Sequence, residues 1–195
     1  MARRNEHSLD EIRGMILNAA ESIIINEGYS ALTVRKVTQK IGYTVASIYM
    51  VFTSMAELVL QIKISTLADL SKKLQLVPNA NPEQHINELA NTYLHFAVKN
   101  YNRWSMIYML NGQSNEEYQQ ITNQLYSSIE TDLALLVRNC SPQLIKQAAR
   151  TLWNSIHGIC SLSLTDLEKV DIHDVEKDIK LLVDNFVAGW KYKSP

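Results

Sequence analysis

Cysteine, proline and glycine are all scarce in this sequence of 195 residues. Two cysteines cannot build a disulfide framework in a chain of this length, which suits a reducing compartment. Only four prolines and six glycines punctuate the sequence, and no run of β-branched and aromatic residues alternates with a period of two. These absences argue against a sheet and predict long helices.

Long apolar runs and a large net charge are also missing. No apolar stretch approaches the roughly 20 residues needed to cross a bilayer, and the opening MARRNEHSLDE is polar where a signal peptide would be apolar. The formal net charge of −1 argues against a generally basic nucleic-acid coat protein, although a local basic patch remains possible. We therefore expect a cytoplasmic protein without a membrane segment.

Capping signals and apolar stripes divide the chain into helices. Ser8, Ser54 and Ser114 are each followed three residues later by glutamate, which fits a capping box. Asn81 and Ser141 each precede a proline, so each pairs a capping side chain with a proline in the first turn. The prediction is an all-α fold of nine helices over residues 8–27, 33–41, 44–52, 54–76, 82–101, 103–111, 114–139, 141–164 and 171–192.

Residues 30–57 contain two short predicted helices joined by a three-residue turn. Thr33 is placed to cap the first of them, and Gly42 supplies the left-handed backbone that ends it. Thr44 then caps the second helix. This layout is typical of a DNA-reading helix-turn-helix, and a compact helical hairpin without a DNA function is the alternative.

The second helix of this motif carries almost no charge. Ala46, Ile48 and Phe52 are expected to face the core, and no arginine, lysine, asparagine or glutamine lies between residues 44 and 52. Bidentate base contacts, worth roughly 1–3 kcal/mol each, are therefore unavailable from it. Hydroxyls and apolar tips can instead bond phosphates and touch thymine methyl groups. The expected DNA contacts are Thr33, Arg35, Lys36, Tyr43, Thr44, Val45, Ser47, Tyr49 and Met50.

The N-terminal stretch resembles the DNA-binding domain of the TetR/AcrR family of bacterial transcriptional repressors. The motifs that carry the resemblance are residues 16–20 (ILNAA), 28–29 (GY), 32–35 (LTVR), 41–44 (IGYT), 48–52 (IYMVF) and 54–58 (SMAEL). The resemblance implies a helix-turn-helix DNA-binding domain over residues 1–53. It also implies a ligand-binding and dimerisation domain over residues 54–195.

Two positions depart from the family pattern. Val51 and Met55 stand where the family often has residues that face phosphate. Their loss lowers the expected affinity and salt dependence. The basic residues left to hold phosphate are Arg3, Arg4, Arg35, Lys36 and Lys40.

Residues 82–164 are rich in large apolar and aromatic side chains. Core packing explains any one of them, but adaptable methionines and amphipathic aromatics as a group suit an apolar ligand pocket. The resemblance implies that a small-molecule inducer binds between helices of this region. The candidate ligand-binding residues are Phe96, Trp104, Tyr108, Tyr126, Trp153 and His157.

Residues 153–158 (WNSIHG) look like the Trp-x-x-x-His-Gly motif of one TetR-family C-terminal domain type. Trp153 and His157 are one turn apart and share a helix face. A buried histidine bonded to a backbone carbonyl is the alternative. The histidines lack a compact metal-ligand spacing, so neither a metal site nor a cofactor is expected.

The helices predicted at 141–164 and 171–192 carry more apolar surface than one protomer's core needs. A four-helix dimer interface is the natural use, and a larger monomer core is the alternative. A homodimer would set two reading helices about 34 Å apart, one turn of DNA. The expected interface residues are Leu144, Ala148, Leu152, Ile159, Leu182 and Phe186.

These features predict a ligand-responsive homodimeric repressor whose partners are a double-stranded DNA operator and a small-molecule effector. Helix 54–76 is the expected link between the effector and the reading head. No nucleophile–base pair, phosphate-binding glycine loop or carboxylate dyad is recognisable, so no enzymatic activity is expected. The alternative is a ligand-independent dimeric DNA-binding or protein-interaction module.

Overall fold

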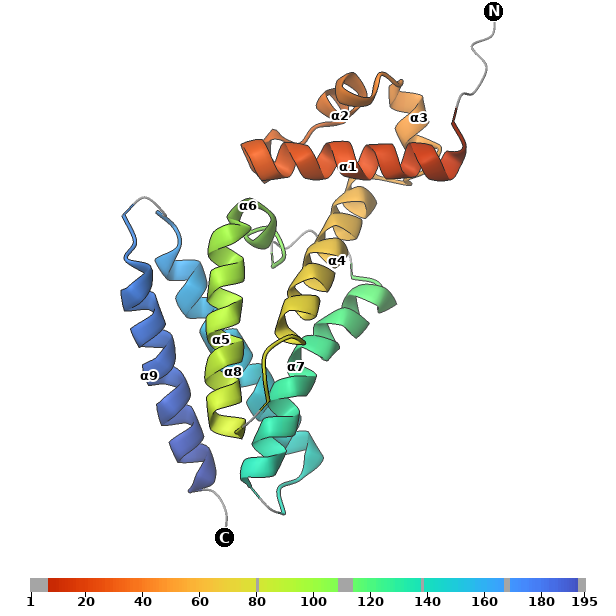
Figure 1. The fold of residues 1–195 in the computed structure, drawn as a ribbon. Coiled ribbons are helices and arrows are strands. Elements are labelled where there is room, and N and C mark those ends of the chain that lie inside the picture. Colours follow the sequence, from red (N-terminus) through yellow and green to blue (C-terminus); the bar gives the residue numbers. More distant parts are fainter. Residues whose placement is uncertain (1–6, 80, 109–113, 138, 167–168, 193–195) are drawn as a thin grey trace, which may run out of the picture. The chain divides into compact units, whose positions relative to one another are not determined.

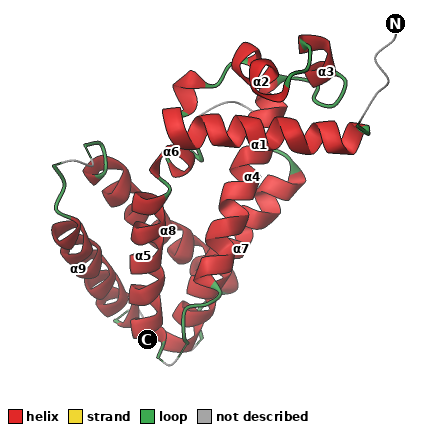
Figure 2. Cartoon of the chain, turned by 45° about the horizontal axis from the view of Figure 1, so that its top comes forward, coloured by secondary structure: helices red, strands yellow, loops and turns green. Residues whose placement is uncertain are grey.

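The computed structural model describes residues 7–79, 81–108, 114–137, 139–166 and 169–192. The described residues form nine α-helices, one 3-10 helix and no strand (Figures 1 and 2), which confirms the all-α prediction. The helices are α1 (Leu9–Glu27), η1 (Tyr29–Ala31), α2 (Val34–Ile41), α3 (Val45–Tyr49), α4 (Met55–Leu74), α5 (Pro82–Lys99), α6 (Tyr101–Trp104), α7 (Glu116–Leu136), α8 (Pro142–Ser163) and α9 (Ile172–Lys191).

Local capping chemistry sets most of the helix starts. The Ser8 hydroxyl accepts from the Glu11 N–H at 3.2 Å, and the Glu11 carboxylate accepts from the Ser8 N–H at 2.6 Å, so this capping box is confirmed. The box predicted at Ser114 is wrong. Helix α7 begins later, because the Asn115 side-chain oxygen accepts from the Tyr118 N–H at 2.8 Å and caps the helix instead.

Two predicted helices are shorter in the structure. Helix α3 ends at Tyr49, because the Val51 N–H bonds to Ile48 three residues back, a tightening that is common where helices end. Helix α6 is a single turn, and residues 105–108 form turns. Residues 109–111 of the predicted span lie outside the described residues.

Internal contacts divide the chain into two compact units. The N-terminal unit comprises residues 1–67 and 100–118, and the C-terminal unit comprises residues 68–99 and 119–195. The first part of α4 falls in the N-terminal unit because Leu58 and Ile62 are buried in its core. The functional division after residue 53 stays a prediction.

The N-terminal unit is built around α1, which packs against α2, α3 and α6. Its apolar stripe is buried at Ile12, Ile16 and Ile23, as helical spacing requires. Val37 of α2 and Ile48 of α3 close the core and have no exposed surface. This unit holds both helices of the predicted DNA-reading motif.

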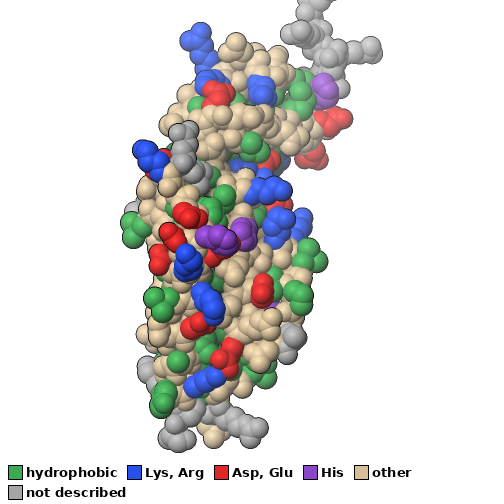
Figure 3. Space-filling model, turned by 60° about the vertical axis from the view of Figure 1, so that its left-hand side comes forward, with side chains coloured by type: hydrophobic (Ala, Val, Ile, Leu, Met, Phe, Trp, Pro, Cys, Tyr) green, Lys and Arg blue, Asp and Glu red, His purple; other side chains and the backbone are tan. Residues whose placement is uncertain are grey.

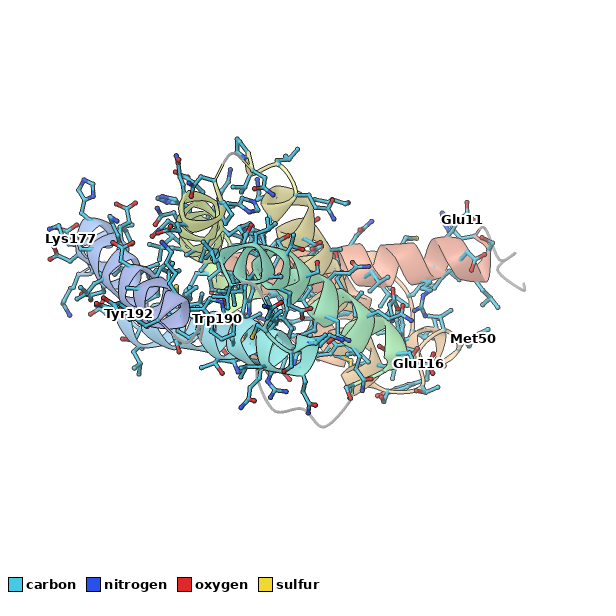
Figure 4. The ribbon with its side chains drawn as sticks, turned by 90° about the horizontal axis from the view of Figure 1, so that it is seen from below. Glu11, Met50, Glu116, Lys177, Trp190 and Tyr192 are labelled. Atoms are coloured by element: carbon cyan, nitrogen blue, oxygen red, sulfur yellow. The ribbon has the colours of Figure 1, made fainter. Side chains whose placement is uncertain are left out.

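The C-terminal unit is built around α5, which packs against α8 and α9, while α8 and α9 also pack together (Figure 1). Trp190 of α9 is buried and donates its indole N–H to the carbonyl oxygen of Leu133 at 3.0 Å, which ties α9 to α7. Two residues further along, Tyr192 is 91% exposed (Figure 4). Among the described residues, no helix is both long and apolar enough to cross a membrane.

Candidate DNA interface and effector region

The turn between α2 and α3 has the backbone geometry that the sequence predicts. The Thr33 hydroxyl accepts from the Lys36 N–H at 3.2 Å and caps α2. Gly42 has φ 74° and ψ 19°, the left-handed conformation that glycine adopts without strain, and its N–H bonds to the carbonyl of Thr38. The Thr44 hydroxyl then accepts from the Ser47 N–H at 3.3 Å and caps α3. The helix-turn-helix is therefore fixed by local chemistry.

One side of α3 is anchored and the other is open. Ile48 has no exposed surface and Phe52, just beyond the helix, is 1% exposed. Val45 is 49%, Tyr49 51% and Met50 63% exposed, and Figure 4 labels Met50. Apolar and hydroxyl-bearing side chains are thus exposed to solvent on a helix that the core holds in place.

The prediction that Ala46 faces the core is wrong, because Ile48 is the buried residue of α3 and Ala46 lies two positions away, on another side of the helix. Ala46 is exposed. Ser47 is half-buried instead, and its hydroxyl is hydrogen-bonded to that of Thr44 at 3.1 Å.

Besides the hydroxyls of Thr33, Thr44 and Ser47, two more of the expected DNA contacts have partners within the protein. The Lys36 ammonium pairs with the Glu27 carboxylate, and the Tyr43 hydroxyl lies 2.7 Å from His7 Nδ1. Arg35 and Lys40 are exposed on α2. Arg3 and Arg4 lie outside the described residues. A DNA phosphate would have to compete for Lys36 and Tyr43, whereas Arg35 is presented outward.

We expect Tyr49→Phe and Thr44→Ala each to weaken operator binding about two- to tenfold, the effect of one hydrogen bond. Tyr49→Phe removes one exposed hydroxyl and leaves α3 intact. Thr44→Ala also removes the cap of α3, so its helix content needs to be measured alongside. Fluorescence anisotropy on DNA selected by the wild-type protein gives the affinities.

Tyr192→Phe, just past the end of α9, is the matched control, because it removes an exposed tyrosine hydroxyl outside the reading head. It is expected to bind DNA as the wild type does. Unchanged affinity in both head variants would remove Tyr49 and Thr44 from the interface.

Three of the predicted effector residues meet in the C-terminal unit. The ring of Trp153 has its centroid 4.8 Å from that of Tyr93 and 6.0 Å from that of Tyr126. His157 Nδ1 lies 2.7 Å from the Tyr93 hydroxyl, and its Nε2 lies 3.0 Å from the Ser161 hydroxyl. Burial lowers the pKa of His157, which keeps the imidazole neutral at neutral pH. We call these five residues the aromatic cluster.

The other predicted effector residues lie elsewhere along the chain. Phe96, on α5, lines an open groove of about 420 Å³. Trp104 and Tyr108 belong to the N-terminal unit, where Trp104 is buried with its ring 6.1 Å from that of Tyr101. Among the described residues, no group of three or more histidine, cysteine or acidic side chains is placed to hold a metal ion.

A second groove, of about 370 Å³, runs between α8 and α9. Leu144, Ala148 and Phe186 line it, and all three are predicted interface residues. Ile159 and Leu182 are half-buried on the same two helices. Leu152 has no exposed surface, so it belongs to the protomer's core and is unable to contact a partner.

The surface of α9 outside the groove mixes charges of both signs. Lys177 and Lys180 pair with Asp174 and Asp184 at 2.7 and 2.6 Å. Figure 3 shows lysines and arginines interspersed with acidic side chains on the face it displays. Such a surface lacks the single-sign field that draws a protein to DNA.

Two protein-family models match the chain, one in its N-terminal part and one in its C-terminal part. The family model for bacterial regulatory proteins of the tetR family matches residues 16–62, and a model for the tetracyclin repressor-like C-terminal domain matches residues 86–186. No curated protein sequence matches the chain.

Solved structures resemble the whole chain. FadR from Bacillus subtilis, a transcriptional regulator in complex with stearoyl-CoA, has a TM-score of 0.67 and 14% identity, covering 90% of this chain and 98% of that one. A TetR variant from Acinetobacter baumannii in complex with minocycline has a TM-score of 0.70 and 14% identity, covering 93% and 97%. PfmR, a TetR-family regulator from Thermus thermophilus, has a TM-score of 0.64 and 16% identity, covering 89% and 97%.

At these identities the structural likeness shows the fold alone, and the family models carry the assignment. The tetR-family model covers the helix-turn-helix whose caps and turn are described above. The C-terminal model spans α5 to α9 and covers more than half of the chain. The chain belongs to the TetR family of bacterial regulatory proteins, which are DNA-binding transcriptional regulators and not enzymes.

Proposed function

We propose that the protein is a homodimeric cytoplasmic repressor that a small apolar or amphipathic molecule releases from a pseudo-palindromic operator. The observation that carries the proposal is the open face of α3. Val45, Tyr49 and Met50 are about half exposed or more on a helix that Ile48 anchors. Exposed apolar side chains gathered on one face mark an interaction site, and thymine methyl groups in the major groove are matching partners.

Reading by such a helix depends on hydroxyls, methyl contacts and DNA shape. The Tyr49 and Thr44 hydroxyls can bond phosphate oxygens, which orients the helix without specifying a base. Val45 and Met50 can touch thymine methyl groups, which favours A·T pairs at those positions. Arg35 and Lys40 on α2 supply the positive charge that α3 lacks.

The effector we propose has an apolar body and one uncharged hydrogen-bonding group. The aromatic cluster supports this chemistry, because its tilted and edge-to-face rings suit an apolar ligand. A neutral His157, which now bonds the Tyr93 and Ser161 hydroxyls, suits an uncharged hydrogen-bonding group in exchange for one of them. Stearoyl-CoA and minocycline, the ligands of two structural relatives, are chemically unlike each other. The fold alone therefore does not determine the effector, and we expect the residues of the aromatic cluster to do so.

We infer that helix α6 transmits the effect of the ligand to α1 and α4, a connection that the sequence does not predict. The Asn102 amide donates to the carbonyl of Ile25 in α1 at 2.9 Å. Arg103 lies 2.9 Å from the Glu21 carboxylate of α1 and bonds the Thr66 hydroxyl of α4 at 3.2 Å. Because α6 follows α5 directly in the chain, a shift of the end of α5 would move α1 and α4 through these bonds.

The experiment that tests the proposal measures operator affinity with and without effector. Molecules that co-purify with the protein are first identified by native mass spectrometry, and acyl-CoA and tetracycline compounds are added as probes. A true effector is expected to lower operator affinity by about 5- to 150-fold, the usual range of coupling between two sites. His157→Gln should weaken effector binding and leave DNA binding without effector unchanged.

A ligand that binds the protein but leaves operator affinity unchanged would contradict the repressor proposal. A ligand shifts a conformational equilibrium only through its differential affinity for the two states. That result would favour the alternative, a ligand-independent dimeric DNA-binding or interaction module.

A further inference from the structure

Arg13 of α1 reaches across the N-terminal unit to the segment that joins α3 to α4. Its Nη1 donates to the carbonyl oxygen of Val51 at 3.0 Å. The centre of its guanidinium lies 4.4 Å from the centroid of the Phe52 ring. The same Nη1 lies 3.9 Å from a carboxylate oxygen of Glu57. Arg13 thus contacts the Val51 carbonyl, the Phe52 ring and the Glu57 carboxylate, which all follow the DNA-reading helix in the chain.

These contacts help to hold α3, which is too short to be stabilised by its own hydrogen bonds. A helix of five residues has few internal hydrogen bonds. The Ile48 carbonyl still accepts from the Val51 and Phe52 N–H groups, but no further helical turn follows to hold the chain beyond them. The guanidinium donates to one carbonyl at this end, and its positive charge suits the negative end of a helix. It also lies over Phe52, which is 1% exposed and fixed in the core. Arg13 therefore connects the end of α3 to α1 through a ring that cannot move freely.

The acidic partner is held in place from the other side. The Glu57 carboxylate accepts from the N–H and from the hydroxyl of Thr53, both at 2.7 Å. The Glu57 N–H donates to the Ser54 hydroxyl at 3.1 Å. The bonds from Thr53, followed by the charge of Arg13, lower the pKa of Glu57, so the carboxylate stays charged. The predicted capping box at Ser54 is thus shifted, with its carboxylate turned to Thr53.

We propose that Arg13 is a positioning residue for DNA reading, which fixes the orientation of α3 against α1 and does not itself hold phosphate. An arginine close to a reading helix would ordinarily be assigned to the DNA backbone, but the contacts of Arg13 are within the protein. The inference rests on DNA reading through α3 and is independent of dimerisation and of any effector.

Arg13→Met tests the inference, because it removes the donors and the charge and keeps an apolar stem. Affinities are measured over a range of salt for the selected operator and for random-sequence duplex DNA. Operator affinity should fall about tenfold, the order of one lost base contact. Affinity for random DNA and its salt slope should not change. A lost phosphate contact would instead lower both affinities and reduce the slope by about one.

Three further variants separate charge from position. Arg35→Met removes the same charge from the exposed face of α2 and should lower both affinities and the slope. Lys72→Met removes a charge from an exposed position of the C-terminal unit and should change neither. Arg13→Lys keeps the charge but loses the planar fork, so we expect it to lose operator affinity as Arg13→Met does.

Each result decides the proposal. Equal losses on both DNAs with a reduced slope would overturn it, as would an unchanged operator affinity or a wild-type affinity in Arg13→Lys. Thermal unfolding shows whether Arg13→Met folds, and if it does not, Arg13→Lys decides alone. If the wild-type protein itself prefers no sequence, DNA reading through α3 fails, which is a different outcome from the failure of Arg13.

Discussion

Phe186→Arg is expected to convert the proposed dimer into a monomer and to lower operator affinity about a hundredfold or more, because linking two binding heads multiplies their affinity by roughly 10²–10⁴. Phe186 lines the groove between α8 and α9 with Leu144 and Ala148. A guanidinium at that position would be buried without a counter-charge in the interface, which costs far more than the lost apolar contact. A single head would then bind a single half-site.

Sedimentation equilibrium gives the oligomeric state of this variant, and fluorescence anisotropy gives its operator affinity. Leu144→Arg, at a residue that is 40% exposed, is a second variant of the same groove if Phe186→Arg folds poorly. Leu76→Arg is the matched control, since Leu76 is 82% exposed and does not line this groove. A dimeric Phe186→Arg protein, or a monomer that binds the operator as tightly as the wild type, would refute the interface.

Ile48→Ala is expected to have the largest effect on the reading head. Ile48 is the one residue of α3 with no exposed surface. Truncating a buried isoleucine to alanine costs about 2–5 kcal/mol, and here it removes the contact that holds the helix to the core. We expect the free energy of unfolding of the N-terminal unit to fall by that amount and specific DNA binding to be lost.

Val45→Ala on the same helix is the matched control. Val45 is 49% exposed, so its truncation should change the free energy of unfolding by less than about 0.5 kcal/mol. It should still weaken operator binding by removing an apolar contact with thymine. Urea unfolding and anisotropy separate the two effects. Equal stability losses in both variants would show that α3 is not anchored as described.

The features predicted correctly from the sequence are those that neighbouring residues determine. Thr33, Gly42 and Thr44 act within a few positions of their partners, so the turn of the motif can be predicted from spacing alone. The sequence predicts the wrong side for Ala46, because helical periodicity is a weak guide over a single turn. Ser114 was displaced by Asn115, which offers an equivalent capping oxygen one position later.

The features that the sequence did not predict depend on tertiary contacts. Arg13 bonds a carbonyl 38 residues away, and nothing in its local sequence separates it from a surface arginine. His85 Nδ1 lies 2.7 Å from the Asp132 carboxylate across 47 residues. Asp132 is fully buried, and burial raises the pKa of its carboxyl. The spacing of the histidines predicts no metal role for His85, but it does not indicate Asp132 as its partner.

The predicted effector residues also divide into those that the sequence places together and those that only the fold does. Trp153 and His157 share a face of one helix, so the sequence could place them together. Their contacts with Tyr93, another helix away, required the fold. Trp104 and Trp153 are the same residue type and are equally buried, yet Trp104 belongs to the N-terminal unit. Residue type alone does not separate a ligand pocket from a packed core.

Selection of random duplex DNA by the purified protein tests whether a dimer reads DNA through the open face of α3. We expect enrichment of a two-fold symmetric sequence with half-sites centred about 10 base pairs, or a multiple of that, apart. A·T pairs should be favoured where Val45 and Met50 meet the major groove. Enrichment of an asymmetric single site, or no enrichment over the starting pool, would contradict it.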